Sequence, residues 1–183
     1  MDFSLWKDIH TISAIQDPGK LLEKKNAQYN SQEELHSQSS LYCYVDASWI
    51  DSNRNAGIGW ILTDAQGRKL LKGSSAIDPT NSVLEAEAIA LSQAVFQIKR
   101  LNYKHVVFSG DSASLYRYLE KVGISCNKKS GILEIQRHLD DIISLAKDHY
   151  SFKHVARNAN SLADALAKAA RTNNSPYVIT WDH

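Results

Sequence analysis

The chain has 183 residues, the length of one ordinary domain or of one domain with an extension, which is enough to bury a core. Hydrophobic residues make up 43% and charged residues 22%, which excludes a wholly disordered chain. Lys and Arg number 21 against 20 Asp and Glu, so the net charge of +1 demands no polyanionic partner. The charges are unevenly distributed along the chain. Residues 1–40 contain four lysines and six acids, whereas the remainder contains 17 basic and 14 acidic residues.

Several other classes of protein are excluded by what the sequence lacks. No apolar run approaches the roughly 20 residues that span a bilayer, and the N-terminal segment has no continuous apolar stretch typical of a secretory signal. Two cysteines, Cys43 and Cys126, are too few for a zinc cluster or a disulfide framework. We therefore expect a soluble intracellular protein, nuclear or cytoplasmic, that acts as a monomer and has no membrane partner.

Residues 1–40 differ from the rest of the chain. They are rich in Gln, Asn, Ser and Lys and show no sustained apolar face. Trp6, Ile9, Ile12 and Ile15 recur at near-helical spacing, which leaves a short docked helix as one interpretation. We favour a polar leader that is partly helical or disordered, with a domain boundary near Ser40.

Three β-type segments follow the leader. Leu41, Cys43 and Val45 alternate with more polar residues, which is the period of a strand. A second run extends from Gly57 to Thr63, and a third from Lys69 to Gly73, with the turn Asp-Ala-Gln-Gly between them. This spacing predicts an antiparallel meander.

The second half of the domain alternates helices and strands. The predicted elements are a helix from Ser82 to Arg100, a strand from Lys104 to Ser109, a helix from Ser112 to Lys121, a helix from Ile132 to Lys147, a strand from Ser151 to Val155 and a helix from Ser161 to Arg171. Strands joined through helices pair in parallel. Residues 41–172 are therefore predicted to form one α/β domain with a mixed five-stranded sheet flanked by helices. Its first three strands are antiparallel, its last two are parallel to the first, and residues 173–183 form a loose tail.

Two aspartates occupy positions where aspartate is uncommon. Asp46 lies in the first strand, where a lone buried carboxylate is costly, and Asp111 directly follows the Val106–Phe108 strand. The carboxyl ends of parallel neighbours meet at one edge of a sheet, so these two side chains are expected to converge. The alternative is structural: Asp46 would start a turn, and Asp111 would cap the following helix.

Helical phase selects one glutamate to join them. At about 100° per residue, Glu87 lies roughly 60° from Leu84 on the apolar stripe, whereas Glu85 lies on its flank. Glu87 is therefore expected to face the sheet, although a first-turn acid can also serve the helix dipole. Asp164 lies opposite Leu162 and Leu166, so phase alone predicts that it is on the surface.

Gathered carboxylates repel one another and raise each other's pKa, and a hard divalent cation relieves this repulsion. Oxygen-only ligands suit Mg²⁺ or Mn²⁺, ions that also bind phosphate oxygens. Two such ions about 4 Å apart are the usual arrangement for cleavage of a phosphodiester. The residues therefore indicate metal-assisted phosphate chemistry.

Four segments together resemble the ribonuclease H fold: YCYVDASW, LEAEAIAL, VVFSGDSAS and FKHVARNANSLADALAKAA. The resemblance covers about residues 41–171. It is nearest to the reverse-transcriptase-like RNase H domains of plant non-LTR retroelements and their stand-alone relatives. The His-Val-x-Arg-x-x-Asn run before Ala-Asp-Ala-Leu-Ala is the most specific part.

The resemblance implies a two-ion catalytic site that takes Mg²⁺, with Mn²⁺ able to substitute. Its four acidic ligands fall on Asp46, Glu87, Asp111 and Asp164. By analogy, Asp46 would bridge both ions and Asp164 would hold the ion on the nucleophile side. Glu87 and Asp111 would hold the ion on the leaving-group side. His154, ten residues before Asp164, matches the family's mobile histidine that assists turnover; otherwise it is simply a histidine at a strand end.

Positions that would bind substrate depart from the family pattern. Its pair of asparagines before the glutamate is replaced in register by Val83 and Leu84, while Asn81 and Ser82 come two residues too early. The remaining candidates for substrate binding are Ser48, Asn81, Asn160, Lys128 and Lys129. Asn160 serves equally well as a helix N-cap, and paired lysines in a loop are commonly only solvated.

Aromatic residues in the first strands could stack on bases or sugars. Tyr42, Tyr44, Trp49 and Trp60 are the candidates. Packing within the core or across strands is the more usual role of aromatics in strands, and we favour it here.

Two functions follow from the resemblance. The first is an endonuclease that cuts the RNA strand of RNA–DNA hybrids with two metal ions. The second is a weak or inactive nucleic-acid-binding domain domesticated from a retroelement. The intact acids favour the first, whereas Val83, Leu84 and the near-neutral charge favour the second. A transposase or exonuclease relative fits less well, because the glutamate position and the Ala-Asp-Ala-Leu-Ala segment match RNase H better.

Overall fold

The computed structural model describes residues 40–124 and 133–181, so residues 1–39 of the predicted leader lie outside them. Six strands form one mixed sheet in the order β5-β4-β1-β2-β3-β6. The strands are β1 (Leu41–Ser48), β2 (Ala56–Thr63), β3 (Lys69–Ile77), β4 (Val106–Gly110), β5 (Tyr150–His154) and β6 (Val178–Trp181). β1, β2 and β3 pair antiparallel, while β4 is parallel to β1 and β5 is parallel to β4. The predicted α/β class and the directions of the first five strands are confirmed.

The sheet has six strands rather than the predicted five. β6 pairs antiparallel with β3, so part of the predicted loose tail is bound to the edge of the sheet. Asn174 adopts a left-handed conformation at φ 48° and ends the last helix, which turns the chain back toward β3. Val-Ile-Thr-Trp has the β-branched and aromatic composition of a strand, but four residues within a polar tail are a weak signal.

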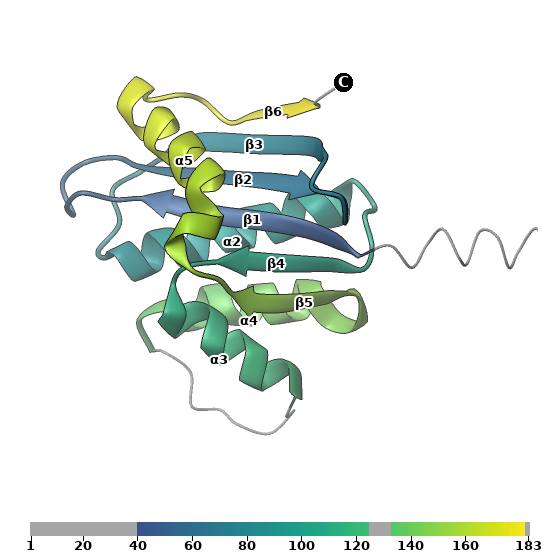
Figure 1. Cartoon of the computed structure of the whole chain (residues 1–183). Helices are drawn as coiled ribbons and strands as arrows, with labels where there is room; N and C mark the ends of the chain where they lie inside the picture. The colour runs from purple at the N-terminus through teal and green to yellow at the C-terminus, as the bar shows by residue number, and fades with distance from the viewer. Residues whose placement is uncertain (1–39, 125–132, 182–183) are drawn as a thin grey trace, which may run out of the picture. The chain divides into compact units, whose positions relative to one another are not determined.

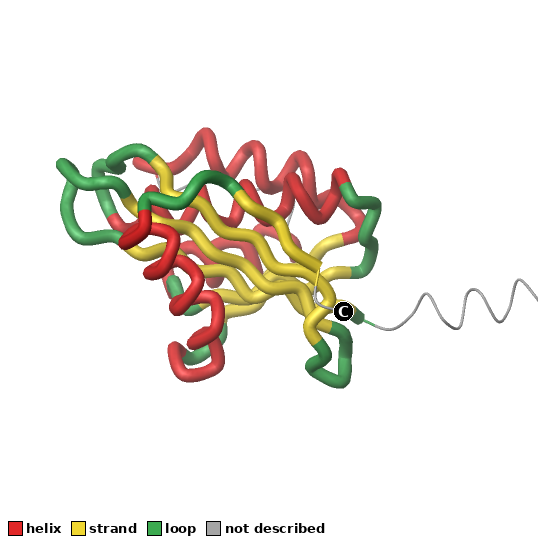
Figure 2. The backbone as a smooth tube through the Cα atoms, turned by 90° about the horizontal axis from the view of Figure 1, so that it is seen from above, coloured by secondary structure: helices red, strands yellow, loops and turns green. Residues whose placement is uncertain are grey.

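Helices cover both faces of the sheet. They are α2 (Val83–Arg100), α3 (Ala113–Ile124), α4 (Gln136–Ala146) and α5 (Ser161–Asn173). α5 crosses one face over β1, β2 and β3, and α2 and α4 lie on the opposite face (Figure 1, Figure 2). The predicted helix from Ile132 to Lys147 is shorter than expected, because 3-10 turns precede and follow α4. Within the described residues, no helix has the length and apolarity needed to cross a membrane.

The start of α2 fixes which of its side chains face the sheet. Ser82 is the N-cap, and its hydroxyl accepts a hydrogen bond from the Glu85 amide at 3.1 Å. The Glu85 carboxylate in turn accepts from the backbone amide of Asn81 at 2.7 Å. Glu85 is thereby engaged at the helix start, while Glu87, Leu91 and other residues of the same stripe are buried. The start of the helix therefore directs Glu87 toward the sheet.

α5 packs closely on β2 because both surfaces carry small residues. Ala163, Ala167 and Ala170 are the buried residues of the helix. They lie against a strand whose facing residues include Gly57 and Gly59, and a Cβ added at Gly59 would lie 2.7 Å from the Ala163 carbonyl oxygen. Such a distance is shorter than ordinary van der Waals contact, so this strand position requires glycine.

We expect Gly59→Ala to lower the free energy of unfolding by about 1–3 kcal/mol, the usual cost of overpacking a core. The added methyl group would push α5 away from β2. Denaturant titration measures the effect, and Ser74→Ala, at the residue paired with Gly59 on β3, is the matched control. Equal stability of Gly59→Ala and the wild type would show that α5 does not depend on this close approach.

Candidate metal-binding active site

Three carboxylates from different elements meet at one edge of the sheet. Asp46 lies near the end of β1, Asp111 directly follows β4, and Glu87 comes from the second turn of α2. One carboxylate oxygen from each lies within 4.8 Å of the others. The parallel pairing of β1 with β4 accounts for the convergence of the two aspartates, because it brings both carboxyl ends to this edge.

These acids are buried in a way that disfavours their charged forms. Asp46 is 4% exposed and Glu87 is 6% exposed. Burial, reinforced by the carboxyls of Asp111 and Asp164, raises the pKa of Asp46 to about 8. Burial, followed by the charges of Asp46 and Asp111, raises the pKa of Glu87 well above its usual range. Without a cation, the neutral forms of these carboxyls are therefore favoured over the charged forms.

The donor set fits a hard divalent cation. The Oε2 atom of Glu87 is buried and has no hydrogen-bond partner, which is unusual for a buried polar atom. A cation shared with Asp46 and Asp111 would satisfy it and remove the mutual repulsion of the three groups. Carboxylate oxygens are the ligands that Mg²⁺ and Mn²⁺ prefer, so the residues present suit either ion.

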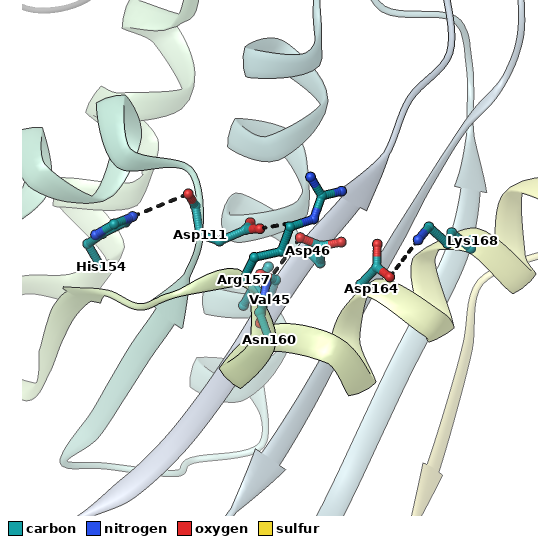
Figure 3. Close-up of polar contacts among 8 residues, drawn as sticks. All are labelled: Val45, Asp46, Asp111, His154, Arg157, Asn160, Asp164 and Lys168. Carbon is teal, nitrogen blue, oxygen red and sulfur yellow. Dashed lines mark hydrogen bonds and ion pairs between the residues drawn. The ribbon is translucent and has the colours of Figure 1, made fainter.

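Asp164, in the first turn of α5, lies beside this cluster. It lines the same cleft as Asp46, and its carboxyl contributes to the raised pKa of Asp46. One of its oxygens accepts from the Nζ atom of Lys168 at 2.7 Å (Figure 3). The cleft of about 350 Å³ above the cluster is lined by all four predicted ligands and also by Lys168. The predicted four acids are therefore brought together around one cleft.

The expected surface position of Asp164 rested on the wrong helix face. Leu162 is 52% exposed, so it does not mark the buried side of α5. The buried face is formed by alanines, and Asp164 follows the first of them, Ala163, by one residue. Helical phase measured from the leucines therefore misplaced it.

Asn160 is buried beneath the cleft rather than exposed in it. Its Nδ2 atom donates to the Val45 carbonyl at 2.9 Å and to the Asp46 carboxylate at 3.0 Å (Figure 3). It occupies the N-cap position of α5 but makes no side-chain capping bond. Its amide therefore ties the start of α5 to the end of β1 and orients Asp46.

Arg157 is a site residue that the sequence reasoning did not select. It lies in the 3-10 turn before α5, lines the cleft, and places its Nε atom 3.9 Å from the Asp111 carboxylate (Figure 3). Its side chain is 82% exposed, so the guanidinium remains accessible to an anion. The arginine in the His-Val-x-Arg-x-x-Asn run was the available signal, and only the fold shows that it reaches the acids.

His154, at the end of β5, lies on the far side of Asp111 from Asp46 (Figure 3). Its backbone amide donates to the Glu120 carboxylate at 2.7 Å. Its ring Nε2 atom lies 3.3 Å from the Asp111 backbone carbonyl oxygen. The histidine is thus next to the cluster, with its ring directed at the backbone of one predicted ligand.

The other candidate substrate residues are dispersed. Ser48 lines the cleft and accepts from the Nε atom of Arg171 at 2.9 Å. Asn81 is exposed and engaged with Glu85 at the start of α2, outside the residues that line the cleft. Lys128 and Lys129 lie outside the described residues. Val83 is 51% exposed and lines the cleft, so an aliphatic group occupies one wall.

Of the four aromatic candidates, only Trp49 lines the cleft with the acids. Trp60 is fully buried, and Trp49 lines the cleft while its Nε1 atom donates to the Thr80 carbonyl at 3.2 Å. Tyr42 and Tyr44 line a second cavity of about 430 Å³ between β1, β2 and the start of α5. The carboxylate in that cavity, Asp64, is paired with Arg68. The larger cavity therefore lacks the clustered acids that mark the smaller one.

The sequence comparisons agree with this geometry. Residues 44–170 match the model of a protein family described as reverse transcriptase-like, and this span contains all four acids. The chain belongs to the reverse transcriptase-like family. Among curated proteins, no sequence matches it.

Solved structures show that this family member has the fold of type 1 RNase H. RNase H1 from the archaeon Halobacterium salinarum is 24% identical, with a TM-score of 0.62 over 73% of this chain and 98% of that one. The N-terminal RNase H domain of a Mycobacterium tuberculosis protein is 18% identical, with a TM-score of 0.62 over 75% and 96%. An RNase H1 isolated from compost, solved with an RNA/DNA hybrid, is 24% identical, with a TM-score of 0.59 over 73% and 98%. The nearer relationship to plant retroelements stays a prediction.

We expect the stability of the metal-free protein to fall as the pH rises from about 4 to about 8. The pKa of Asp46 rises from 3.8 to about 8 on folding, so between these values the folded state binds more protons than the unfolded state. The stability that the protonated Asp46 carboxyl contributes is fully present below the pKa of the unfolded state. It is lost as the pH rises through the pKa of the folded state. Asp46→Asn should flatten this dependence and raise the unfolding free energy at pH 8 by about 1–3 kcal/mol.

Denaturant unfolding across this pH range, in EDTA, is the measurement. Asp141→Asn, at an exposed acid on α4, is the matched control and should follow the wild type. Adding Mn²⁺ at 100 times its Kd should stabilise the wild type by about 2.7 kcal/mol and stabilise Asp46→Asn less. Parallel pH profiles for the wild type and Asp46→Asn would contradict the electrostatic account.

Proposed function

We propose that this chain is a divalent-metal-dependent endonuclease that hydrolyses the RNA strand of RNA–DNA hybrids. The observation that carries the proposal is the cluster of Asp46, Glu87 and Asp111 with the unpartnered Glu87 oxygen, at one edge of an RNase H fold. Fold alone does not assign a reaction, whereas this donor set is suited to phosphodiester cleavage. One similar structure contains an RNA/DNA hybrid, which supports the choice of substrate.

Four residues would hold two ions. Asp46, Glu87 and Asp111 would hold one ion, and Asp46 together with Asp164, which lines the same cleft, would hold the second. Bound divalent ions orient the attacking water and offset the charge that develops on the phosphate. Mg²⁺ is the proposed ion, with Mn²⁺ able to replace it.

The chain's own side chains then orient the acids and the substrate. Asn160 fixes the Asp46 carboxylate by donating to it, which reduces its freedom to turn away from the cleft. The exposed guanidinium of Arg157 can donate to a phosphate oxygen in the same cleft. His154, close to Asp111, is the proposed residue that assists turnover by moving a proton near the leaving group.

One observation favours the alternative of a weak nucleic-acid-binding domain. Lys168 binds Asp164 directly, and the three-carboxylate cluster forms without that aspartate. An ion bound by Asp46 and Asp164 must compete with the ammonium group. Weak cleavage together with measurable hybrid binding would favour this alternative.

The deciding experiment is cleavage of a hybrid labelled on its RNA strand, in Mg²⁺, in Mn²⁺ and in EDTA. We expect cleavage of the RNA strand with either ion and none in EDTA. Asp46→Asn should reduce cleavage to background because a shared ligand is lost at nearly constant volume, whereas Asp141→Asn should cleave normally. Cleavage by Asp46→Asn at the wild-type rate would rule out the proposed site.

Val83→Asn should tighten hybrid binding. The exposed valine on the cleft wall would be replaced by an amide that can bond a 2′-hydroxyl of the RNA strand. One such bond contributes about 0.5–1.5 kcal/mol, or roughly 2- to 12-fold in affinity. Hybrid affinity is measured at fixed salt, with Ca²⁺ in place of Mg²⁺ to suppress cleavage, and Val83→Ala is the control that lacks a donor. No gain over Val83→Ala would show that this position does not limit binding.

A further inference from the structure

The two walls of the acid cleft differ in charge. One wall, formed by α5 and the turn before it, carries Arg157 and Lys168, with Arg171 bound to the cleft residue Ser48. The opposite wall, at the starts of α2 and α3, is formed by Val83, Leu84, Ser112 and Ser114, none of which is charged. A polyanion entering this cleft therefore meets cations on one side only.

Two of the cations share a face of α5 with a predicted metal ligand. Lys168 and Arg171 follow Asp164 by four and seven residues, and these spacings place side chains on the same side of a helix. The three also follow the buried Ala163, Ala167 and Ala170 by one residue each, so they border the face packed on the sheet. The close packing of α5 thus holds these cations beside the cleft.

Helix stabilisation explains both cations only in part, since Arg171, in the last turn of α5, also suits the negative end of the helix dipole. Lys168 forms an ion pair with Asp164 one turn earlier, a common stabilising arrangement on helices. Arg171 instead reaches from α5 to the hydroxyl of Ser48 on β1, which is uncharged. Among residues 40–124 and 133–181, no carboxylate forms an ion pair with Arg171, so its charge is not neutralised there.

Distance along the helix indicates what Arg171 would contact. At about 1.5 Å per residue, Arg171 lies roughly 10 Å along α5 from Asp164. Phosphates on one strand of a duplex are spaced about 3.4 Å apart along its axis. Arg171 would therefore contact a different phosphate from the one held at the acids.

We propose that Lys168 and Arg171 form a phosphate-contact track on α5, along which the nucleic-acid backbone crosses the cleft. The aliphatic wall with Val83 then faces sugars and base edges. This inference rests on the proposed function. It adds that the nucleic-acid backbone lies against the α5 wall of the cleft. Contacts to phosphates are independent of sequence and sensitive to salt, so the track has a measurable signature.

The test is hybrid affinity measured by fluorescence anisotropy over a series of salt concentrations, with Ca²⁺ in place of Mg²⁺. We expect Arg171→Gln and Lys168→Gln each to reduce the slope of log K against log salt by about 0.7–1. Affinity near 0.1 M salt should fall about 5- to 10-fold for each variant. Lys69→Gln, at an exposed lysine at the start of β3, is the matched control and should keep the wild-type slope.

Two further readouts separate the track from other causes. Arg171→Lys should retain the wild-type salt slope, because the positive charge is kept. Arg171→Gln should bind Ca²⁺ with the wild-type affinity, measured by calorimetry, because no metal ligand is altered. Wild-type slopes in both glutamine variants would overturn the track and leave the proposed function standing. Absence of hybrid binding by the wild type would overturn both.

Discussion

The burial of Asp46 and Glu87 next to each other is the interaction on which the rest of the site depends. Two carboxyls in a low-dielectric environment destabilise each other's charged forms, and both pKa values are raised as a result. The described protein groups offset this destabilisation of the charged carboxylates only in part. Asn160 donates to Asp46 and Arg157 approaches Asp111, while one oxygen of Glu87 has no partner. Such an arrangement is a poor means of stabilising a fold and a good means of binding a cation.

The scaffold holds these acids on regular elements rather than on loops. Asp46 lies within β1, which is paired on both sides, with β2 and with β4. Asp111 immediately follows β4, and Glu87 lies in a helix whose start is fixed by Ser82. Repulsion among the three carboxyls can therefore be relieved by protonation or by a cation more readily than by movement. Rigid support of this kind is what preorganises a metal site.

Sequence reasoning predicted the parts of the fold that depend on strong periodicity. The meander and the apolar stripe of α2 are such parts, and that stripe selected Glu87 over Glu85 by phase alone. β6 was missed because a four-residue strand in a polar tail has little pattern, although its pairing with β3 is regular. The family resemblance supplied the predicted role of Asp164, which hydrophobic phase had assigned to the surface.

Contacts that depend on the folded arrangement were beyond the sequence. Three polar side chains within a span of 12 residues each contact a different acid. The contacts are Arg157 with Asp111, Asn160 with Asp46, and Lys168 with Asp164. The spacing of four residues suggests an ion pair between Lys168 and Asp164, but it does not show that the lysine lies at the cleft. The resemblance predicted a family and four acidic ligands, but it did not show which cations lie beside those acids.

Small residues determine where the charged ones lie on α5. Leucines were expected to mark the buried face, but Gly57 and Gly59 remove the side chains that would keep the helix at a distance. The alanines then become the contact surface, and Leu162 is left exposed. Because α5 advances about 100° per residue, the residues that follow those alanines turn toward the edge of the sheet where β1 ends. Asp164, Lys168 and Arg171 are those residues, so one packing choice positions both a predicted metal ligand and the cations that border the cleft.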